Sequence, residues 1–459
     1  MGCRAYFLLV LGFSSPGLCA QWETVGEGWG GLVRDLHYDS LSGRLYVVGA
    51  SQWAMPGNVL IHNTAYWYNG QWYPMGGGAD HPNGFPTGLR PPAKDIIPYD
   101  SGFVVVGDFW SMSGVPHTRG FAKWENDQWV AMASDTTLGN FWGSSVDDGQ
   151  LHLHGAFNTV DGQPISNWAV YDGTTWQQVD TTEEFGFNTA KAVRYQGDLY
   201  VAGNFNTSNG VNDLARQGPN GWEALGPGLL GDPWVNEMVV YDGLLWVTGE
   251  FYSWWGNAAS GIMAWDGSQW HNMFPDIFAI AQGGDMDVAN GKLYFSGFFN
   301  ANGMNGMYGY GVYDGSSVCL FGGPEVIRGN MTFSADTMYA SAPYTLYGTA
   351  GGPVVKYIIK WPLDAPMDTC YTVASRVPAL GAGSETWTVS PNPATGHLTV
   401  QAGGAWQQLR AYDATGRLVL AQDLPQPRIA VGHLPAGLYT LIFLDAKGYP
   451  VGRARFAKE

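Results

Sequence analysis

The chain has 459 residues, of which 65 are glycine, 21 are tryptophan and 24 are tyrosine, while only 13% are charged. This composition favours many short strands joined by tight turns, and it argues against a helical bundle. Residues 21–384 carry 14 basic against 34 acidic residues, and a surface this negative argues against nucleic acid or anionic lipid as a partner.

The first twenty residues are typical of a signal peptide. Arg4 precedes the apolar run AYFLLVLGF (5–13), and Leu18-Cys19-Ala20 resembles a cleavage site, which predicts cleavage between Ala20 and Gln21. A lipoprotein signal through Cys19 is the alternative. The apolar run is too short to span a bilayer, and no later stretch approaches the necessary length. The sequence therefore predicts an exported chain without a transmembrane segment.

Residues 21–364 contain seven repeats. Each repeat has a short apolar run that ends in a small residue, and these small residues are Gly49, Gly107, Gly155, Gly203, Gly249, Gly297 and Ala342. A second pattern follows in most repeats, for example YWYNGQW (66–72) and AWDGSQW (264–270). Periods of about 45–50 residues with several strands each are typical of propeller blades. We therefore predict an all-β chain with a seven-bladed β-propeller.

The hairpin pattern and the ends of the repeat region refine this prediction. Asn-Gly and Asp-Gly suit type I′ turns, and the flanking tryptophans are expected to fill the space between blades. The mature chain begins with QWETVGEGWGG (21–31), which matches the segment after the hairpin in a complete repeat, and the seventh repeat lacks that segment. The N-terminal strand is therefore expected to complete the last blade and close the ring. The repeats resemble bacterial propellers distantly related to the galactose-oxidase and kelch group, a resemblance that implies no activity.

Two cysteines follow the signal peptide, Cys319 and Cys370. Because an exported protein meets oxidising conditions, a disulfide between them is one hypothesis, and two unpaired buried thiols are the other.

After a linker at 365–388, a different small domain is expected at 389–459. Alternating apolar residues with turns every 8–12 positions predict a small Ig-like β-sandwich. Four of its segments carry a recurring motif, with the residues Pro391, Asn392, Pro393, Gly396, Asp413, Gly416, Leu434, Pro435, Gly437 and Tyr439, followed by a basic end. Together these segments closely resemble the type A C-terminal sorting domain of the type IX secretion system. The resemblance implies export through the periplasm and across the outer membrane by the type IX machinery, with the protein then released or attached to the surface.

The loops that follow the repeat glycines vary most between repeats. They place Trp53, Trp110, Trp254 and Trp255 among Asn, Asp and Ser residues, and equivalent blades would present all these loops on one face. Aromatic rings beside polar side chains can stack on sugar rings, and loops on a rigid scaffold commonly carry binding. These four tryptophans are the candidate ligand-binding residues, and gap filling between blades is the alternative.

Other candidates for chemistry are weaker. His152 and His154 lie two apart on one strand and face the same side, but no third ligand accompanies them, so packing is preferred over a metal site. Asp108 and Glu250 directly follow repeat glycines and could form an acid–base pair, although they belong to distant blades, and Asp285 and Asp287 are similar candidates. Motifs typical of serine hydrolases, zinc proteases and P-loops are missing, so no catalytic residue, metal or cofactor is predicted.

These observations favour a secreted or surface-attached propeller that acts as a non-catalytic binding or adhesion module, for polysaccharide or for a surface protein. An extracellular carbohydrate-active enzyme, either a hydrolase or a lyase, is the alternative.

Overall fold

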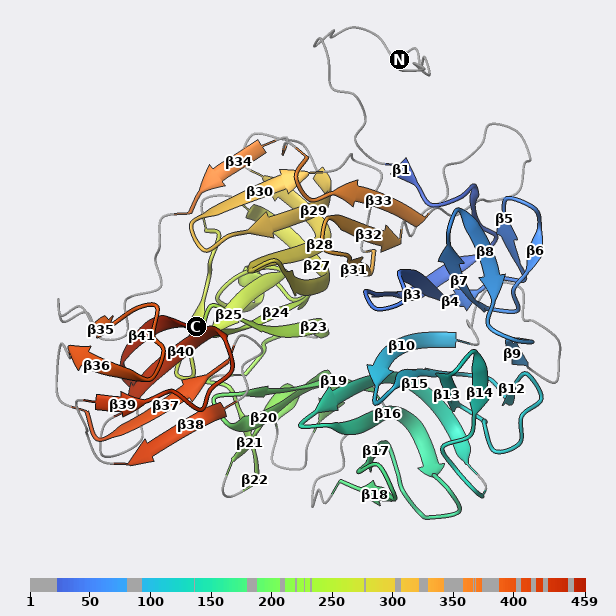
Figure 1. Cartoon of the computed structure of the whole chain (residues 1–459), viewed down its shortest axis with the longest axis horizontal. Coiled ribbons are helices and arrows are strands. Elements are labelled where there is room, and N and C mark those ends of the chain that lie inside the picture. The colour runs from blue at the N-terminus through green and yellow to red at the C-terminus, as the bar shows by residue number, and fades with distance from the viewer. Residues whose placement is uncertain are drawn as a thin grey trace, which may run out of the picture.

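Apart from one short 3-10 turn, the described part of the computed structural model is all-β (Figure 1). The described residues are 23–80, 93–135, 137–179, 188–206, 211–218, 221–226, 228–231, 233–275, 278–301, 307–321, 329–341, 358–365, 367, 369–373, 388–401, 406–413, 418–423, 428–444 and 450–459.

Seven antiparallel sheets of the described residues are the blades of the predicted propeller. Blades 1 and 2 are β3 (Leu32–Asp39), β4 (Arg44–Ala50), β7 (Thr64–Tyr68) and β8 (Gln71–Pro74), then β10 (Ala93–Tyr99), β11 (Gly102–Gly107), β13 (Phe121–Glu125) and β14 (Gln128–Val130). Blades 3 and 4 are β15 (Leu138–Asp147), β16 (Gln150–Thr159), β17 (Trp168–Tyr171) and β18 (Trp176–Gln178), then β19 (Asn188–Tyr195), β20 (Asp198–Asn206), β21 (Asn212–Gly218) and β22 (Gly221–Ala224).

Blade 5 is β23 (Trp234–Tyr241), β24 (Leu244–Glu250), β25 (Ile262–Trp265) and β26 (Trp270–His271). Blade 6 is β27 (Phe278–Ala289), β28 (Lys292–Ala301), β29 (Met307–Tyr313) and β30 (Ser317–Phe321), with β34 (Thr369–Thr372) as a fifth strand. Blade 7 is β31 (Met331–Phe333), β32 (Thr337–Ser341), β33 (Ile358–Pro362) and the N-terminal β1 (Glu23–Thr24).

The blades close into a ring. The innermost strands β3, β10, β15, β19, β23, β27 and β31 each contact the innermost strands of both neighbouring blades, and β31 contacts β3. At the seam, β1 pairs with β33 in the register Glu23↔Lys360 and Thr24↔Ile359, and the Val25 amide donates to the Ile358 carbonyl over 2.7 Å. The prediction that the N-terminal strand completes the last blade is therefore confirmed, and the ring leaves no open sheet edge at this point.

The hairpin tryptophans connect neighbouring blades. Trp129 Nε1 donates to the Met75 carbonyl over 2.7 Å, and Trp176 Nε1 donates to the Met132 carbonyl over 2.8 Å. In both cases the donor lies in the outermost strand of one blade, and the acceptor follows the outermost strand of the preceding blade. These buried indoles fill the space between blades, as predicted, and they also satisfy their single polar atom.

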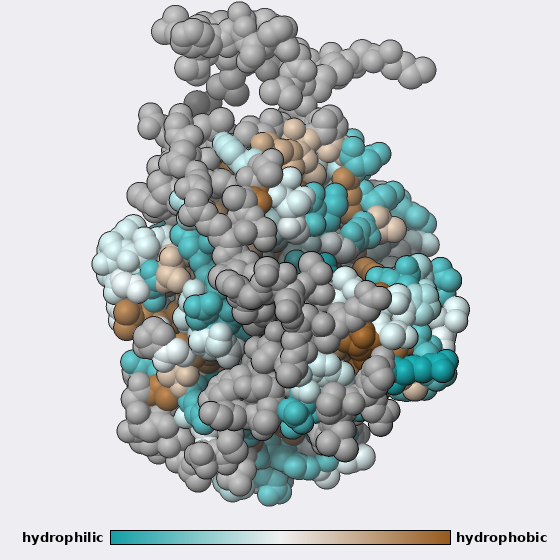
Figure 2. All heavy atoms as spheres, turned by 90° about the vertical axis from the view of Figure 1, so that its left-hand side faces the viewer, coloured by the Kyte–Doolittle hydropathy of each residue, from teal (hydrophilic) through white to brown (hydrophobic). Residues whose placement is uncertain are grey.

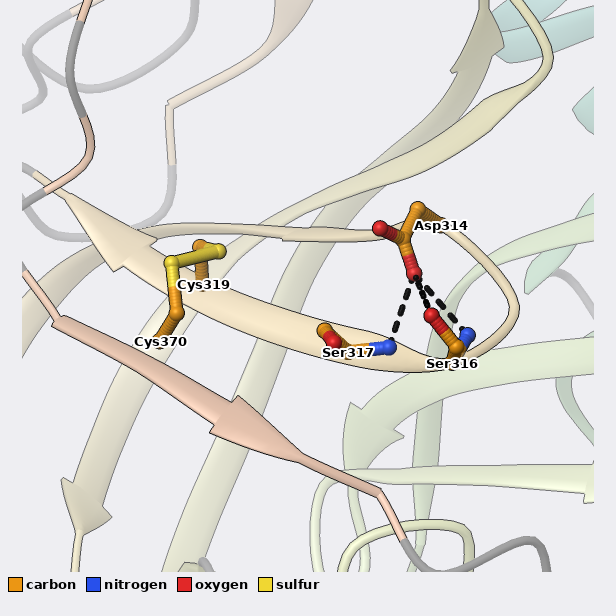
Figure 3. The surroundings of a disulfide bond; sticks show 5 residues. All are labelled: Asp314, Ser316, Ser317, Cys319 and Cys370. Carbon is orange, nitrogen blue, oxygen red and sulfur yellow. Dashed lines mark hydrogen bonds between the residues drawn. A yellow bond between two sulfur atoms is a disulfide. The ribbon is translucent and has the colours of Figure 1, made fainter.

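The turn prediction is confirmed for one type of hairpin and wrong for another. Asn69 and Gly70 have φ of 47° and 79°, as a type I′ turn requires. In the longer Asp-Gly-x-x turns the aspartate instead accepts backbone hydrogen bonds, as when Asp314 Oδ1 accepts from the Ser316 and Ser317 amides over 2.9 and 2.7 Å (Figure 3). Two additional residues separate the strands there, so an aspartate-capped turn replaces the two-residue turn.

A disulfide joins blade 6 to the segment that follows the ring. Cys319 of β30 and Cys370 of β34 are directly opposed in the antiparallel pair, and their sulfurs are bonded (Figure 3). The two cysteines are 51 positions apart in the sequence, and the segment between them includes the whole of blade 7 except β1. The covalent link therefore encloses the strand on which ring closure depends.

Because neighbouring strands are antiparallel, the connections alternate between two sides of the ring. We call the side with the connections between the second and third strands of each blade, and between successive blades, the loop face. The opposite side, with the tight turns within each blade, is the hairpin face. Two small sheets lie among the loop connections. One holds β2 (Gly28–Trp29), β5 (Trp53–Met55) and β6 (Val59–Leu60), and the other holds β9 (Ala79–Asp80) and β12 (Ser111–Met112).

The C-terminal domain is a sandwich of two sheets. One sheet holds β35 (Thr388–Ser390), β36 (His397–Gln401) and β39 (Arg428–Ala430), and the other holds β37 (Gln408–Tyr412), β38 (Leu418–Asp423), β40 (Gly437–Leu444) and β41 (Pro450–Lys458). Buried residues from both sheets, such as Leu398 and Phe443, form one core, so the predicted small sandwich is confirmed.

The sandwich lies beside blades 4 and 5 (Figure 1). Arg410 donates to the Gln196 carbonyl over 3.3 Å and Arg455 is paired with Asp242, both in first turns on the hairpin face. In the side view of Figure 2, the coloured hydrophobic residues form small patches separated by hydrophilic ones.

Candidate functional site

The four tryptophans predicted to bind ligand all have exposed rings, in contrast to the buried hairpin tryptophans. Their side chains are 46% (Trp53), 52% (Trp110), 60% (Trp254) and 37% (Trp255) exposed, and all four follow the second strand of a blade, on the loop face. They belong to blades 1, 2 and 5, so the two tryptophans of blade 5 are adjacent and the other two lie elsewhere on the rim.

In blade 5, two loops pack together and present an aromatic surface. Asn257 fastens one loop to the other, because its Oδ1 accepts from the Leu230 amide over 2.9 Å and its Nδ2 donates to the Leu230 carbonyl over 2.9 Å. A Cβ atom added to Gly231 would lie 2.2 Å from the Trp255 ring, which shows how closely the loops approach. The surface therefore has a defined shape before any ligand arrives.

The stacking in this surface leaves Trp254 exposed. Trp254 stacks on Tyr252 with ring centroids 4.1 Å apart, and Trp255 meets the same tyrosine edge-on at 4.8 Å. Gln282 donates a hydrogen bond to the Tyr252 hydroxyl and so holds the supporting ring. Tyr252 covers one face of Trp254, and the residue is nevertheless 60% exposed.

Leu230 extends this surface, because it is 37% exposed and a Cβ atom added to Gly256 would lie 2.9 Å from its side chain. Trp234, the first residue of β23, is 47% exposed and is paired with Glu250, where the same loop begins. We call Leu230, Trp234, Trp254 and Trp255 the blade 5 aromatic cluster. Sequence reasoning missed Leu230 and Trp234, although a signal was present. Leu230 lies in the segment between blades 4 and 5, and Trp234 begins the next strand, where this segment leaves the same face as the loop after the repeat glycine.

The remaining two tryptophans have different surroundings. The Arg119 guanidinium lies over the Trp110 ring at 4.4 Å, so one face of this ring already has a cationic partner. Trp53 lies in β5 opposite Leu60 of β6, and both side chains are exposed.

His152 and His154 lie in the interior, at the boundary between blades 3 and 4. Trp168 Nε1 donates to His152 Nδ1 over 3.0 Å, and His154 Nε2 is 3.4 Å from the Ser145 hydroxyl. Burial lowers the pKa of His152 to about 4 and lowers the pKa of His154 well below its usual value, so both rings are neutral at pH 7. Among the described residues, no group of three His, Cys, Asp or Glu side chains could hold a metal ion.

The His152 ring is expected to make the propeller sensitive to acid. Its folded pKa is below the unfolded value of 6.5, so its contribution to stability is complete above pH 6.5 and is lost as the pH falls toward 4. The shift corresponds to about 3 kcal/mol. The side-chain carbonyl of His152→Gln can still accept from Trp168. Between pH 7 and pH 4, the free energy of unfolding of this variant should fall by about 3 kcal/mol less than that of the native chain. His117→Asn, at an exposed turn position, is the control and should keep the native pH dependence in denaturant titrations.

The structure does not place Asp108 and Glu250 in one site. Asp108 follows β11 in blade 2 and Glu250 ends β24 in blade 5, and blades 3 and 4 lie between them. An acid–base pair of these two side chains is therefore not supported.

Charged residues do meet at the centre of the ring. In six blades the innermost strand has a register shift at the same place relative to the repeat glycine. In each of these blades, the residue two positions after the strand partner of the repeat glycine lies at this shift. Together with the equivalent residue of blade 7, these residues form what we call the axial ring. Its members are Asp35, Asp95, Gly143, Lys191, Glu237, Asp285 and Asn330.

Polar contacts in the axial ring cross the boundaries between blades. Asp35 Oδ2 accepts from the Ile96 amide over 3.0 Å, Asp95 Oδ2 accepts from the Ser144 amide over 2.6 Å, and Asp285 Oδ2 accepts from the Met331 amide over 2.5 Å. Each acceptor belongs to one blade and each donor to the next. Lys191 Nζ lies 3.0 Å from Glu237 Oε2, which joins blade 4 to blade 5. Only Asp285 was singled out from the sequence, although a polar residue precedes the buried apolar residue of most first strands.

The sorting motif organises the C-terminal sandwich. Asn392 lies at its centre, because its Nδ2 donates to the Arg455 carbonyl over 3.0 Å and its Oδ1 accepts from the Ala457 amide over 2.9 Å. The Tyr439 hydroxyl donates to the Pro435 carbonyl over 2.8 Å, and Leu434 is buried in the core. The Pro-Asn-Pro segment is thereby attached to β41, the basic last strand.

The other motif residues are distributed around these contacts. Pro391 and Pro393 flank Asn392, Gly396 lies next to Gly432, Asp413 follows β37, and Gly437 begins β40. Gly416 lies outside the described residues, as do Ala20 and Gln21 of the expected signal cleavage site. No helix in the described ranges is long and apolar enough to cross a membrane.

Comparisons with known proteins identify the C-terminal domain. Residues 388–451 match the family described as the secretion system C-terminal sorting domain. A comparison with curated proteins gave no match.

Several solved structures are similar to this chain over most of its length. One is PorZ of Porphyromonas gingivalis, described as an essential bacterial surface component of its type-IX secretion system, with 13% identity, a TM-score of 0.41, and coverage of 94% of this chain and 59% of PorZ. The extracellular domain of BT3049 from B. thetaiotaomicron has 9% identity and a TM-score of 0.47, with 96% and 57% covered. A fungal alcohol oxidase of the AA5 family, in complex with copper, has 14% identity and a TM-score of 0.41, with 95% and 99% covered.

The chain thus spans less than two thirds of the first two of these proteins. The sheet order, the ring of innermost strands and the matched C-terminal family lead to one conclusion. This chain is a seven-bladed β-propeller that carries a type IX secretion system C-terminal sorting domain at residues 388–451, and it is exported to the outer surface or beyond.

Proposed function

We propose that this exported propeller is a non-catalytic binding module that takes sugar rings of a polysaccharide on the blade 5 aromatic cluster. The observation that carries the proposal is the exposure of Trp254, which is 60% exposed and stacked on Tyr252. Exposed apolar side chains that are grouped in one patch commonly mark a binding site. Trp53 and Trp110 provide further contacts along the rim.

Two properties of the cluster favour a polysaccharide. The loops are already joined through Asn257, so little conformational entropy is lost on binding. The four members of the cluster carry no charge, and residues 21–384 are strongly acidic, so a neutral polysaccharide meets less repulsion than a uronate or a sulfated chain.

Replacing Trp254 with alanine is expected to weaken binding of the mature full chain to a neutral polysaccharide by about fivefold or more, because truncating a central aromatic contact typically costs more than about 1 kcal/mol. Titration calorimetry against a panel of neutral and anionic polysaccharides measures the effect. Leu41→Ala is the matched control, since Leu41 is 97% exposed but lies in a turn on the hairpin face. Unchanged affinity in both Trp254→Ala and Trp255→Ala would refute the assignment of the site.

The alternative is a carbohydrate-active enzyme. Asp285 favours it to a limited extent, because burial and then the nearby Glu237 raise its pKa to about 7, within the range of a general acid. Release of reducing ends from the same polysaccharides, and its loss in Asp285→Asn, would support catalysis. Binding without release supports the module.

A further inference from the structure

The axial ring connects most of the blade boundaries, including the seam. Contacts between ring members or their direct neighbours join blade 1 to 2, 2 to 3, 4 to 5 and 6 to 7. Asn330 Nδ2 donates to Asp35 Oδ1 over 3.1 Å, so blade 7 is held to blade 1 beside the point where the N-terminal strand closes the ring. Asn236, which precedes Glu237, donates to the Gly283 carbonyl over 2.7 Å and joins blade 5 to 6. Blade 3 contributes Gly143, which has no side chain to offer blade 4.

The ring has more carboxyl groups than cations. Four of its members are acidic and only Lys191 is basic. The charged groups and histidines on the strands that form the ring are Arg34, Asp35, His37 and Asp39 on β3, Lys94 and Asp95 on β10, Asp147 on β15, Lys191 and Arg194 on β19, Glu237 on β23, and Asp285 and Asp287 on β27. Lys191 interacts with Glu237, Asp95, Asp35 and Asp285, so one ammonium group is shared by four carboxyls.

Protonation is the way in which such a ring relieves its surplus charge. Burial, followed by the charge of Asp95 and a hydrogen bond with it, raises the pKa of Asp35 well above its usual value. Burial, followed by the charge of Glu237, raises the pKa of Asp285 to about 7, and burial raises the pKa of the more exposed Asp287 to about 6. A hydrogen bond between two carboxyl groups requires that one of them keeps a proton.

We propose that the axial ring is a proton-dependent lock, which holds neighbouring blades together more firmly in mildly acidic than in alkaline surroundings. With a proton between Asp35 and Asp95, the two carboxyls join blade 1 to blade 2. Without it, two negative charges face each other across that boundary, and Asp285 adds a further charge near Glu237. The strength of the contacts between neighbouring blades therefore depends on pH at the centre of the propeller.

The direction of the effect follows from linkage. Each of these carboxyls holds its proton more tightly in the folded chain, so it stabilises the fold at low pH and loses that contribution as the pH rises through its folded pKa. For Asp285 the window lies between about pH 4 and pH 7. His37 and His152, whose pKa values burial lowers to about 4, act in the opposite direction in nearly the same window, as does the buried His154. The pH dependence of stability in the native chain alone therefore does not test the proposal. The difference in pH dependence between a variant and the native chain does test it.

The test is Asp285→Asn in the mature full chain. An asparagine Oδ1 can still accept from the Met331 amide, so the contact between blades 6 and 7 remains while the titration is removed. Denaturant unfolding is followed by tryptophan fluorescence at pH 5, 6, 7 and 8. As the pH rises from 5 to 7, the ratio of the variant's unfolding equilibrium constant to that of the native chain should fall by up to about tenfold for each pH unit. Asp148→Asn, in an exposed turn on the hairpin face, should follow the native chain.

A second variant and a direct measurement complete the design. Asp287→Asn should show the same sign over a window that ends near pH 6, and it needs no contact between blades to be preserved. Carbon-13 resonances of the aspartate carboxyls in the native chain should include one that titrates near pH 7 and disappears in Asp285→Asn, if that variant folds. Parallel pH profiles for the Asn variants and the native chain, or carboxyls that all titrate near pH 4, would overturn the proposal.

Discussion

Replacing Trp29 with alanine is expected to lower the free energy of unfolding by about 3–5 kcal/mol, the usual cost of truncating a fully buried tryptophan. Trp29 is 0% exposed and lies in β2, directly after the strand that closes the ring. It belongs to a core cluster that also contains Val25, Trp72 and Ile358, so one indole connects the N-terminal segment, blade 1 and blade 7. Its loss should weaken the seam, where β1 pairs with β33.

Denaturant titration of the purified mature chain measures this effect. The matched control is Trp53→Ala, because Trp53 lies in β5, the strand that pairs with β2, but is 46% exposed. The control should change the free energy of unfolding by less than about 1 kcal/mol. The Trp29 variant should also aggregate more readily, since an open ring presents unpaired strand edges. Equal effects of the two substitutions would show that the seam does not depend on this core.

Removal of the disulfide is expected to cost about 4 kcal/mol, the loop entropy for a cross-link between residues 51 positions apart. The Cys319–Cys370 bond encloses β31, β32 and β33. Without the bond, this segment has more conformational freedom in the unfolded chain, which favours unfolding. Cys319→Ser combined with Cys370→Ser should therefore lower the midpoint of denaturant unfolding.

Reduction of the native chain is the complementary experiment, because it breaks the bond without changing a side chain. The reduced native chain and the double serine variant should have the same lowered midpoint, and reductant should have no further effect on the variant. If reductant leaves the native midpoint unchanged, β34 is held by its pairing with β30 alone, and the disulfide contributes nothing to closure.

The sequence alone was sufficient for the architecture. A strand alternates its side chains over two residues, and a hairpin depends on a few turn residues, so the blades could be predicted from local patterns. Closure could be predicted because QWETVGEGWGG (21–31) supplies the segment that the seventh repeat lacks. The sorting domain could be recognised because each of its motif segments is short and continuous in the sequence, whereas the contact of Asn392 with β41 joins segments that are far apart.

Only the tertiary structure decided which distant residues meet. Asp35, Asp95, Lys191, Glu237 and Asp285 come from five blades, and their shared position depends on a register shift that no single repeat reveals. Leu230 and Trp234 join Trp254 because segments before and within one blade emerge on the same face. Local patterns determine strands and turns, whereas burial, charge interactions and pKa shifts depend on distances between segments that the closed ring alone brings together.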